Sequence, residues 1–308
     1  MTTILTIALN PAVDISSETE FVRPTRKIRT SKTRHDPGGG GINVARVITT
    51  LGGDVEALFL AGGEIGLLLD RLLETEGIHR HLVRSASQTR ISFMVRELGT
   101  GLEYRFVAEG PAVRSDELQR CLDLVASRKE RYVVASGSLP AGAPCDTYAR
   151  MAELAAIRGA KFVLDSSGAG LSTTLEQSRV FLVKPSRGEL EQLVGKKLDE
   201  DGIRQAAGDI VARGSAELVA VTMGADGALL ASTEGILRLP AIHVRVRSAV
   251  GAGDSFLGAM TWALSEGKAP ADAFRFGMAA GAAAVMTSGT QLCRHEDVLH
   301  LYQSGFAP

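Results

Sequence analysis

The sequence predicts an α/β fold with a doubly wound, mainly parallel β-sheet. Three observations support this prediction. Short apolar runs typical of strands alternate with helical patterns over residues 115–231. These runs end in small and polar residues, which is typical of sheets that bind ligands at the carboxyl ends of their strands. Two glycine-rich runs, at residues 38–41 and 251–253, each open a predicted helix, a common arrangement for binding anions.

The composition suits one globular domain, which we predict over residues 1–308. The chain is 45% hydrophobic and 22% charged, and its 34 basic and 35 acidic residues nearly balance. This balance argues against a broad basic surface, so we expect no nucleic-acid or membrane partner. Three cysteines far apart in the sequence suggest neither a disulfide framework nor a zinc site. The N-terminal run is typical of a strand rather than a signal peptide, so we expect a cytoplasmic protein.

The first third of the chain predicts the start of the sheet and a small β-lid. Residues 3–9 form a β-rich run that ends at Asn10 and Pro11. Residues 12–35 and 88–108 have hairpin patterns that interrupt the α/β alternation, so we assign them to the lid. The other elements expected here are a helix at residues 42–51, a strand at 57–60, a helix at 65–76, and lid strands at 90–96 and 102–107.

The rest of the chain predicts the alternating core. We expect helices at residues 116–127, 146–158, 190–194, 203–213 and 256–264. We expect strands at residues 132–135, 162–164, 181–183, 218–222, 228–231 and 242–246. The run at residues 276–290 is rich in alanine and glycine, which suits a tightly packed helix.

The run Gly251-Ala252-Gly253-Asp254 is the motif around which the functional prediction is built. It would lie at a helix N-terminus, where unpaired N–H groups and the helix dipole attract anions. The carboxylate of Asp254 would repel a bound phosphate, unless it accepts a proton from a hydroxyl that attacks that phosphate. The alternative is a tight turn with an aspartate N-cap, which the motif alone does not exclude.

Two further groups of residues suggest a ligand that carries a hydroxyl group and a phosphate. Residues 38–41 are four glycines directly before an apolar helix that carries Asn43, which favours close approach of a ligand over a flexible linker. Arg90 and Arg105 lie at the ends of the lid hairpin away from its turn, and a pair of arginines is a good phosphate clamp. Exposed strand arginines are an alternative of comparable weight. The basic run at residues 21–36 is by default a solvated strand edge.

Both glycine-rich runs belong to a recognisable pair of signatures. Residues 38–45 resemble the N-terminal signature of the PfkB, or ribokinase-like, carbohydrate kinases, and residues 251–254 resemble their C-terminal signature. The resemblance spans essentially the whole chain, and within the family it is closest to the bacterial type-2 6-phosphofructokinases. The runs that carry this closer resemblance are NPAVD at 10–14, KIR at 27–29, PGGGGINVAR at 37–46, YRFV at 104–107, SGSLP at 136–140, DSSG at 165–168 and VGAGDS at 250–255.

The resemblance implies a ribokinase-like, Rossmann-type core, a β-lid that forms a homodimer interface, and ATP, Mg²⁺ and K⁺ as cofactors. By matching position, the catalytic base is Asp254 and the anion hole is formed by Gly251, Ala252 and Gly253. The sugar phosphate would be bound by Asp14, Gly38, Gly39, Asn43, Arg90, Arg105 and Ser138. The nucleotide and its magnesium would be bound by Lys184, Ser186, Glu189, Thr222, Gly224 and Gly227. A monovalent-cation loop would contain Ser248, Val250, Ala284 and Gly289, and inhibition by a second ATP would involve Lys27 and Arg29.

The chain departs from the family pattern at two places. The magnesium-side motif Asn-x-x-Glu becomes Ser186-x-x-Glu189, which leaves the affinity for magnesium open, and the usual Asp-Thr-Thr becomes Ser248-Ala249-Val250. The activity implied by the resemblance is transfer of phosphate from ATP to fructose 6-phosphate. A 1-phosphofructokinase, a tagatose-6-phosphate kinase and a catalytically weak sugar-phosphate sensor stay open as alternatives.

Overall fold

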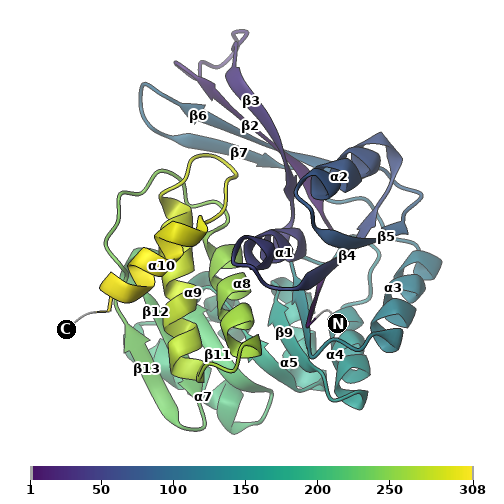
Figure 1. Cartoon of the computed structure of the whole chain (residues 1–308), viewed down its shortest axis with the longest axis vertical. Coiled ribbons are helices and arrows are strands. Elements are labelled where there is room, and N and C mark those ends of the chain that lie inside the picture. Colours follow the sequence, from purple (N-terminus) through teal and green to yellow (C-terminus); the bar gives the residue numbers. More distant parts are fainter. Residues whose placement is uncertain (1–2, 307–308) are drawn as a thin grey trace.

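The larger of two β-sheets forms the centre of the molecule (Figure 1). A computed structural model describes residues 3–306. The sheet has the order β13-β12-β11-β10-β9-β8-β1-β4-β5, parallel from β11 to β5 with an antiparallel hairpin at the other edge. This confirms the predicted mainly parallel sheet. Its strands are β1 (Ile4–Ala8), β4 (Val55–Ala61), β5 (His79–Arg84), β8 (Tyr132–Ser136), β9 (Lys161–Asp165), β10 (Val180–Val183), β11 (Ala216–Thr222), β12 (Ala228–Ser232) and β13 (Gly235–Leu239).

Helices cover both faces of this sheet, as a doubly wound fold requires. Strand β1 shows the two-sided burial: Ile4 and Ala8 pack into one apolar core, and Leu5 and Ile7 pack into the other. One core is covered by α1 (Gly40–Thr50), α2 (Gly63–Thr75), α8 (Ala252–Ser265), α9 (Pro270–Val285) and α10 (His295–Ser304). The other is covered by α3 (Ser115–Ser127), α4 (Thr147–Ile157), α5 (Gly168–Gln177), α6 (Arg187–Val194) and α7 (Glu200–Ala212).

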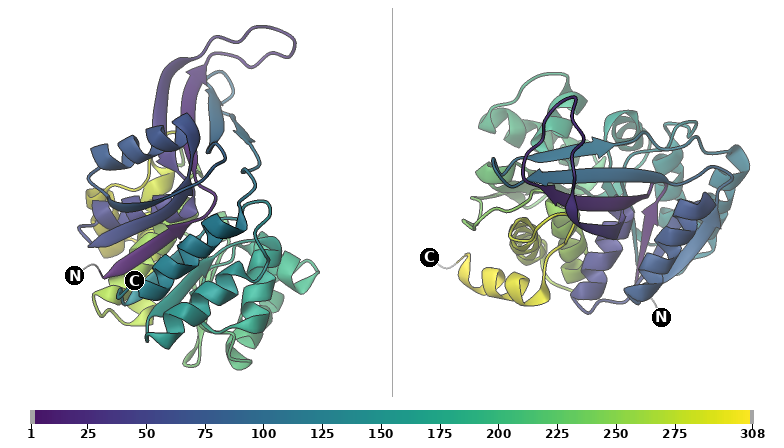
Figure 2. Two further views of the ribbon diagram at one scale, coloured as in Figure 1. Left: turned by 90° about the vertical axis from the view of Figure 1, so that its right-hand side faces the viewer. Right: turned by 90° about the horizontal axis from the view of Figure 1, so that it is seen from above.

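The smaller sheet projects from the main body, and its β2–β3 hairpin extends furthest (Figure 2). Its order is β3-β2-β6-β7, made of β2 (Ala12–Thr19), β3 (Ser31–Gly38), β6 (Arg90–Glu97) and β7 (Glu103–Val107). These strands lie in the two segments assigned to the lid, although β3 runs on to Gly38. Because α1 begins at Gly40, the lid strand leads directly into the glycine loop. We refer to this four-stranded sheet as the lid.

One predicted strand is wrong, and one predicted helix has different bounds. Residues 242–246 are not a strand, because the chain leaves the sheet edge after β13 and crosses to the end of α9, where the Arg247 N–H donates to the Val285 carbonyl at 2.7 Å. Apolar alternation cannot reveal that a strand partner is missing. The helix expected at residues 276–290 is confirmed as α9, but it begins at Pro270 and ends at Val285, where the Thr287 N–H and Oγ–H both donate to the Ala284 carbonyl. Within residues 3–306, no helix is both long and apolar enough to cross a bilayer.

Candidate active site

The predicted polar clusters gather at one edge of the larger sheet, under the lid. Asn10 follows β1, Ser136 ends β8, Asp165 ends β9 and Lys184 follows β10. Carboxyl ends of parallel strands meet at the same edge, which is where such folds bind ligands. The run from Gly251 reaches this edge from a loop rather than from the expected strand.

The start of α8 carries the acidic residue at the centre of the site. Gly251 is the N-cap with φ +73°, and Asp254 lies in the first turn. The Asn43 Nδ2 of α1 donates a hydrogen bond to Asp254 Oδ2 at 2.8 Å. Burial, and then the charge of Asp165, raise the pKa of Asp254 to about 6. A carboxylate with a pKa this close to neutral, at a helix start that attracts anions, has the properties of a general base for an attack on phosphate.

The four glycines that join β3 to the first turn of α1 are required by close packing. A Cβ atom on Gly38 would collide with the Asp14 carboxyl group, one on Gly40 with Ser136, and one on Gly41 with the Ile7 carbonyl. Gly39, with φ +101°, would bring a Cβ atom within 2.9 Å of the Pro11 backbone. The glycine run therefore fixes lid strand β3 and α1 against the edge of the sheet, which rules out a flexible linker.

Three of the predicted sugar-side residues, Asp14, Arg90 and Arg105, lie on one face of the lid. Asp14 pairs in register with Ser92 of β6, and burial raises the pKa of its carboxyl group. The charges of Arg46, Arg105 and Arg90 oppose that shift, so all three guanidinium groups lie close enough to act on Asp14. Arg105 pairs in register with Met94 of β6, so it is not the direct neighbour of Arg90 in the sheet. The prediction that the two lid arginines lie near each other is supported only by the fact that both act on Asp14.

The two lid arginines differ in their surroundings. Arg90 is half-buried and donates hydrogen bonds to the Asn10 carbonyl at 2.8 Å and to the Ala108 carbonyl at 2.9 Å. The Arg105 side chain is exposed, and within residues 3–306 this side chain forms neither a hydrogen bond nor an ion pair. Arg90 is therefore part of the fold as well as of the site, whereas Arg105 is available to a ligand.

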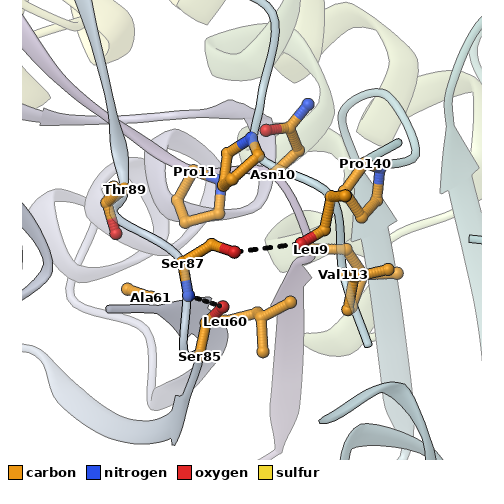
Figure 3. Close-up of a pocket in the computed structure, with 12 residues that line it drawn as sticks. Leu9, Asn10, Pro11, Leu60, Ala61, Ser85, Ser87, Thr89, Val113 and Pro140 are labelled. Carbon is orange, nitrogen blue, oxygen red and sulfur yellow. Dashed lines mark hydrogen bonds between the residues drawn. The ribbon is translucent and has the colours of Figure 1, made fainter. Parts of the chain in front are cut away.

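A small recess lies beside the sugar side, between the end of β1 and neighbouring loops (Figure 3). Ser138 accepts a hydrogen bond from Asn10 Nδ2 at 3.2 Å, and Asn10, Pro11 and Ser87 line the recess. Its volume of about 10 Å³ suits at most one water molecule. The recess is therefore a small gap in the packing around Asn10, and it is too small for a sugar.

An ion pair that the sequence did not identify faces the start of α8. Lys184 Nζ lies 3.1 Å from Asp165 Oδ1, and both side chains are largely buried. A Cβ atom on Gly253 would lie 3.5 Å from the same ammonium group, so the lysine sits directly beside the anion-binding turn. Burial lowers the pKa of Lys184, but the charges of Asp165 and Glu189 raise it by more, so the net shift is upward. The sequence signals for Asp165 were its position at the end of a strand and its place in the run DSSG at 165–168, and neither pointed to a pair with Lys184.

The predicted magnesium-side residues bond to each other. The Ser186 N–H donates to Glu189 Oε2 at 2.7 Å and the Glu189 N–H donates to Ser186 Oγ at 3.3 Å, which forms a capping box at the start of α6. The Ser186 Oγ–H also donates to Glu189 Oε2 at 2.8 Å. Thr222 lies next to them, because its N–H donates to the Pro185 carbonyl at 3.0 Å. Gly224 is exposed in the turn after β11, and Gly227 packs against the backbone of Leu239, so its role is to close that turn.

The predicted cation loop is a set of backbone turns under the lid. The Ser248 Oγ–H donates to Glu103 Oε2 of β7 at 3.0 Å, and Val250 N–H donates back to Ser248 Oγ at 3.2 Å. The Ala284 carbonyl already accepts two bonds from Thr287, which leaves it poorly placed as a cation ligand. Gly289, the remaining predicted member of the loop, lies in the turn that follows α9, with φ +67°.

The residues predicted to respond to a second ATP lie far from this edge. Lys27 and Arg29 are exposed, in the segment that joins β2 to β3. The side chain of Thr19 holds this segment by donating to the Arg29 carbonyl at 3.1 Å. Both charges face outward from the end of the lid.

Comparison with known proteins identifies the family of the chain. Residues 4–297 match the pfkB family of carbohydrate kinases. The ATP-dependent 6-phosphofructokinase isozyme 2 of Mycobacterium tuberculosis is 42% identical over 308 residues, covering 99% of this chain and 90% of that protein. A 1-phosphofructokinase of Haloferax volcanii is 32% identical and covers 96% of this chain and 95% of that protein.

Solved structures of phosphofructokinase-2 from Escherichia coli share the fold. Its complex with fructose 6-phosphate has a TM-score of 0.94 and 36% sequence identity, with all of both chains covered. Its complex with potassium has the same TM-score, at 38% identity over 98% of this chain and 99% of that one. A tetrameric inhibited form has a TM-score of 0.93, at 37% identity with the same coverage. The chain is therefore a member of the pfkB family of carbohydrate kinases.

Proposed function

We propose that this protein is a 6-phosphofructokinase, which transfers the γ-phosphoryl group of ATP to the O1 hydroxyl of fructose 6-phosphate. The observation that carries the proposal is the placement of Asp254 in the first turn of α8, with a pKa of about 6 and an Asn43 amide 2.8 Å away. Asp254 accepts the proton of the attacking hydroxyl. The N–H groups at Gly251, Ala252 and Gly253 and the ammonium group of Lys184 stabilise the charge on the transferred group.

A substrate that already carries a phosphate explains the charge on the lid. Asp14 accepts a hydrogen bond from a sugar hydroxyl, while Arg105 and Arg90 contact the existing phosphate. Gly38, Gly39, Asn43 and Ser138 complete the sugar side. An unphosphorylated sugar would give Arg90 and Arg105 no phosphate to contact, and both would share the Asp14 carboxylate.

The residues on the nucleotide side fit ATP with magnesium. No group of three or more His, Cys, Asp or Glu side chains among the described residues could hold a metal alone. Kinases instead commonly bind magnesium through one or two carboxylates, several waters and the substrate phosphates, and Glu189 is such a carboxylate. The ion neutralises charge that develops on the phosphates. Lys184, Thr222 and Gly224 would then lie on the nucleotide side, and Ser186, which bonds to Glu189, would help to hold the ion, through a water if at all.

The cation loop fits K⁺ less completely. The carbonyl groups of Ser248, Val250 and Gly289 can turn toward a monovalent ion, whereas the Ala284 carbonyl would first have to release a bond from Thr287. The potassium complex of the E. coli enzyme supports the presence of such a site.

We also propose a homodimer that forms through the outer face of the lid. Phe93 and Phe106 are opposite each other in β6 and β7 and are 46% and 64% exposed. Exposed aromatic pairs of this kind mark interaction surfaces. The tetrameric inhibited form of the E. coli enzyme supports assembly into oligomers and a state that is inhibited. We assign inhibition by a second ATP to Lys27 and Arg29. A reaction that uses ATP and a sugar phosphate is expected in the cytoplasm.

A coupled assay of ADP release tests the proposed substrate. Fructose 6-phosphate, fructose 1-phosphate, tagatose 6-phosphate and unphosphorylated fructose are compared by kcat/KM, with Asp254→Asn as the blank. We expect the highest value for fructose 6-phosphate. A higher value for fructose 1-phosphate would favour the 1-phosphofructokinase activity of the 32% identical relative. Binding of sugar phosphate with no turnover would favour a sensor.

A further inference from the structure

One side chain outside the predicted site, Arg46 of α1, bonds to α1, β3 and the end of α2. Arg46 lies one turn after Asn43 on the same face of α1, and its side chain is 10% exposed. Its Nε and Nη2 atoms donate to the two carboxylate oxygens of Glu76, at 2.8 and 3.0 Å, at the end of α2. Its Nη1 donates to the Pro37 carbonyl of β3 at 2.9 Å and approaches Asn43 Oδ1 at 3.4 Å.

These contacts determine which way the amide of Asn43 faces. A guanidinium group can only donate hydrogen bonds, so the amide atom turned toward Arg46 must be the oxygen. The NH₂ group of the amide is then turned toward Asp254. If the amide rotated by half a turn, its oxygen would face the carboxylate and only a protonated Asp254 could bond to it.

We propose that Arg46, held in place by Glu76, is a positioning residue that locks the Asn43 amide so that it donates to the base Asp254. The inference rests on the proposed function only in that Asp254 is taken as the base. Arg46 touches neither Asp254 nor the place of the transferred phosphate, so its effect passes through Asn43.

The charged groups around this chain of contacts come from several elements. Asp254 is faced by Asp165 of β9, by Lys184 after β10 and by Asp14 of β2. Arg46 is faced by Glu76 and also acts on Asp14. Replacing Arg46 leaves Asp165 and Lys184 in place. A change in the pKa of Asp254 would therefore report mainly a change in the orientation of the Asn43 amide.

The test is the dependence of kcat/KM for the sugar phosphate on pH in Arg46→Met. A hydrogen bond donated to the charged carboxylate favours that form, so its loss should move the acidic limb upward by about one pH unit. Activity lost near pH 6.5 should then be largely recovered at about pH 8. An acidic limb that overlays that of the wild type would overturn the proposal.

A matched control separates positioning from general support of the fold. Arg128 forms a similar two-pronged pair with Glu56, at 2.9 and 2.6 Å, away from the site. Arg128→Met should leave the limb unmoved even if the protein becomes less stable. In an Asn43→Ala background, Arg46→Met should add no further shift, because both changes remove the same bond. Additive shifts would mean that Arg46 acts on Asp254 directly, contrary to the proposal.

Two further measurements keep the proposal testable. If Arg46→Met does not fold, Arg46→Lys is used, since one ammonium group cannot hold Glu76, Pro37 and Asn43 together, and a smaller shift in the same direction is expected. A ¹³C-carboxyl NMR titration, assigned with Asp254→Asn, reads the pKa of Asp254 without any turnover. A wild type that phosphorylates no sugar phosphate would reject the proposed function, while this titration would still decide the role of Arg46.

Discussion

Replacing the two lid arginines separately should give different phenotypes, although both were predicted to bind one phosphate. The Arg105 side chain is exposed and forms neither a hydrogen bond nor an ion pair within residues 3–306. The Arg90 side chain donates hydrogen bonds to the carbonyls of Asn10 and Ala108. A charge-assisted contact with phosphate is worth about 1.5–3 kcal/mol, which corresponds to roughly a 10- to 150-fold rise in KM. Arg105→Ala should therefore raise the KM for fructose 6-phosphate by that factor and leave the free energy of unfolding nearly unchanged.

Arg90→Ala should raise the same KM and also destabilise the protein. Two carbonyls lose a charged donor, each bond being worth on the order of 1 kcal/mol or more, so the free energy of unfolding should fall by about 2 kcal/mol. The assays are steady-state kinetics with each substrate varied in turn, and urea unfolding of both variants. Equal destabilisation by both substitutions, or an effect on the KM for ATP alone, would refute this division of roles.

Three other predictions follow from the site and the lid. The kcat/KM of the wild type should fall as the pH drops through about 6, because Asp254 must be deprotonated to act as a base and burial raises its pKa to about 6. A profile that stays flat down to about pH 5 would contradict this role. Ser186→Asn keeps a good helix cap and offers a longer oxygen ligand, so it should lower the magnesium concentration that gives half-maximal rate; superimposable magnesium titrations would place position 186 outside the metal side. Lys27→Ala should weaken inhibition by high ATP at low fructose 6-phosphate without changing the rate at low ATP; simple saturation of the wild type by ATP would remove the basis of this prediction.

The alternating pattern of the sequence predicted most of the larger sheet because its strands are buried on both faces. The pattern failed at the edges of the sheet. Strand β5 begins His79-Arg80-His81 and is half exposed, so it lacks the apolar run that marks a buried strand. Residues 242–246 alternate correctly but have no strand partner. Pairing depends on the rest of the fold, which a local pattern does not describe.

The candidate site could be predicted in part for a similar reason. Glycines, and an aspartate at a helix start, carry their chemistry in a short stretch of sequence, so the residues near Gly39 and Asp254 were identified. Contacts between distant segments left little signal. The pair formed by Asp165 and Lys184 joins two strands, and the bond from Arg46 to Asn43 is recognisable only once Glu76 and Pro37 are placed beside it.

The measurement that tests the central claim most directly is the turnover of Asp254→Asn with fructose 6-phosphate and ATP. The amide keeps the shape of the side chain and loses the base, so we predict a fall in kcat of about 10²–10⁴-fold. Calorimetric titration should show sugar-phosphate binding close to that of the wild type. Burial raises the pKa of Asp254, which means that its charged form disfavours folding at neutral pH, so the variant should be at least as stable to heat. A folded variant that turns over at close to the wild-type rate would contradict the assignment of Asp254 as the base.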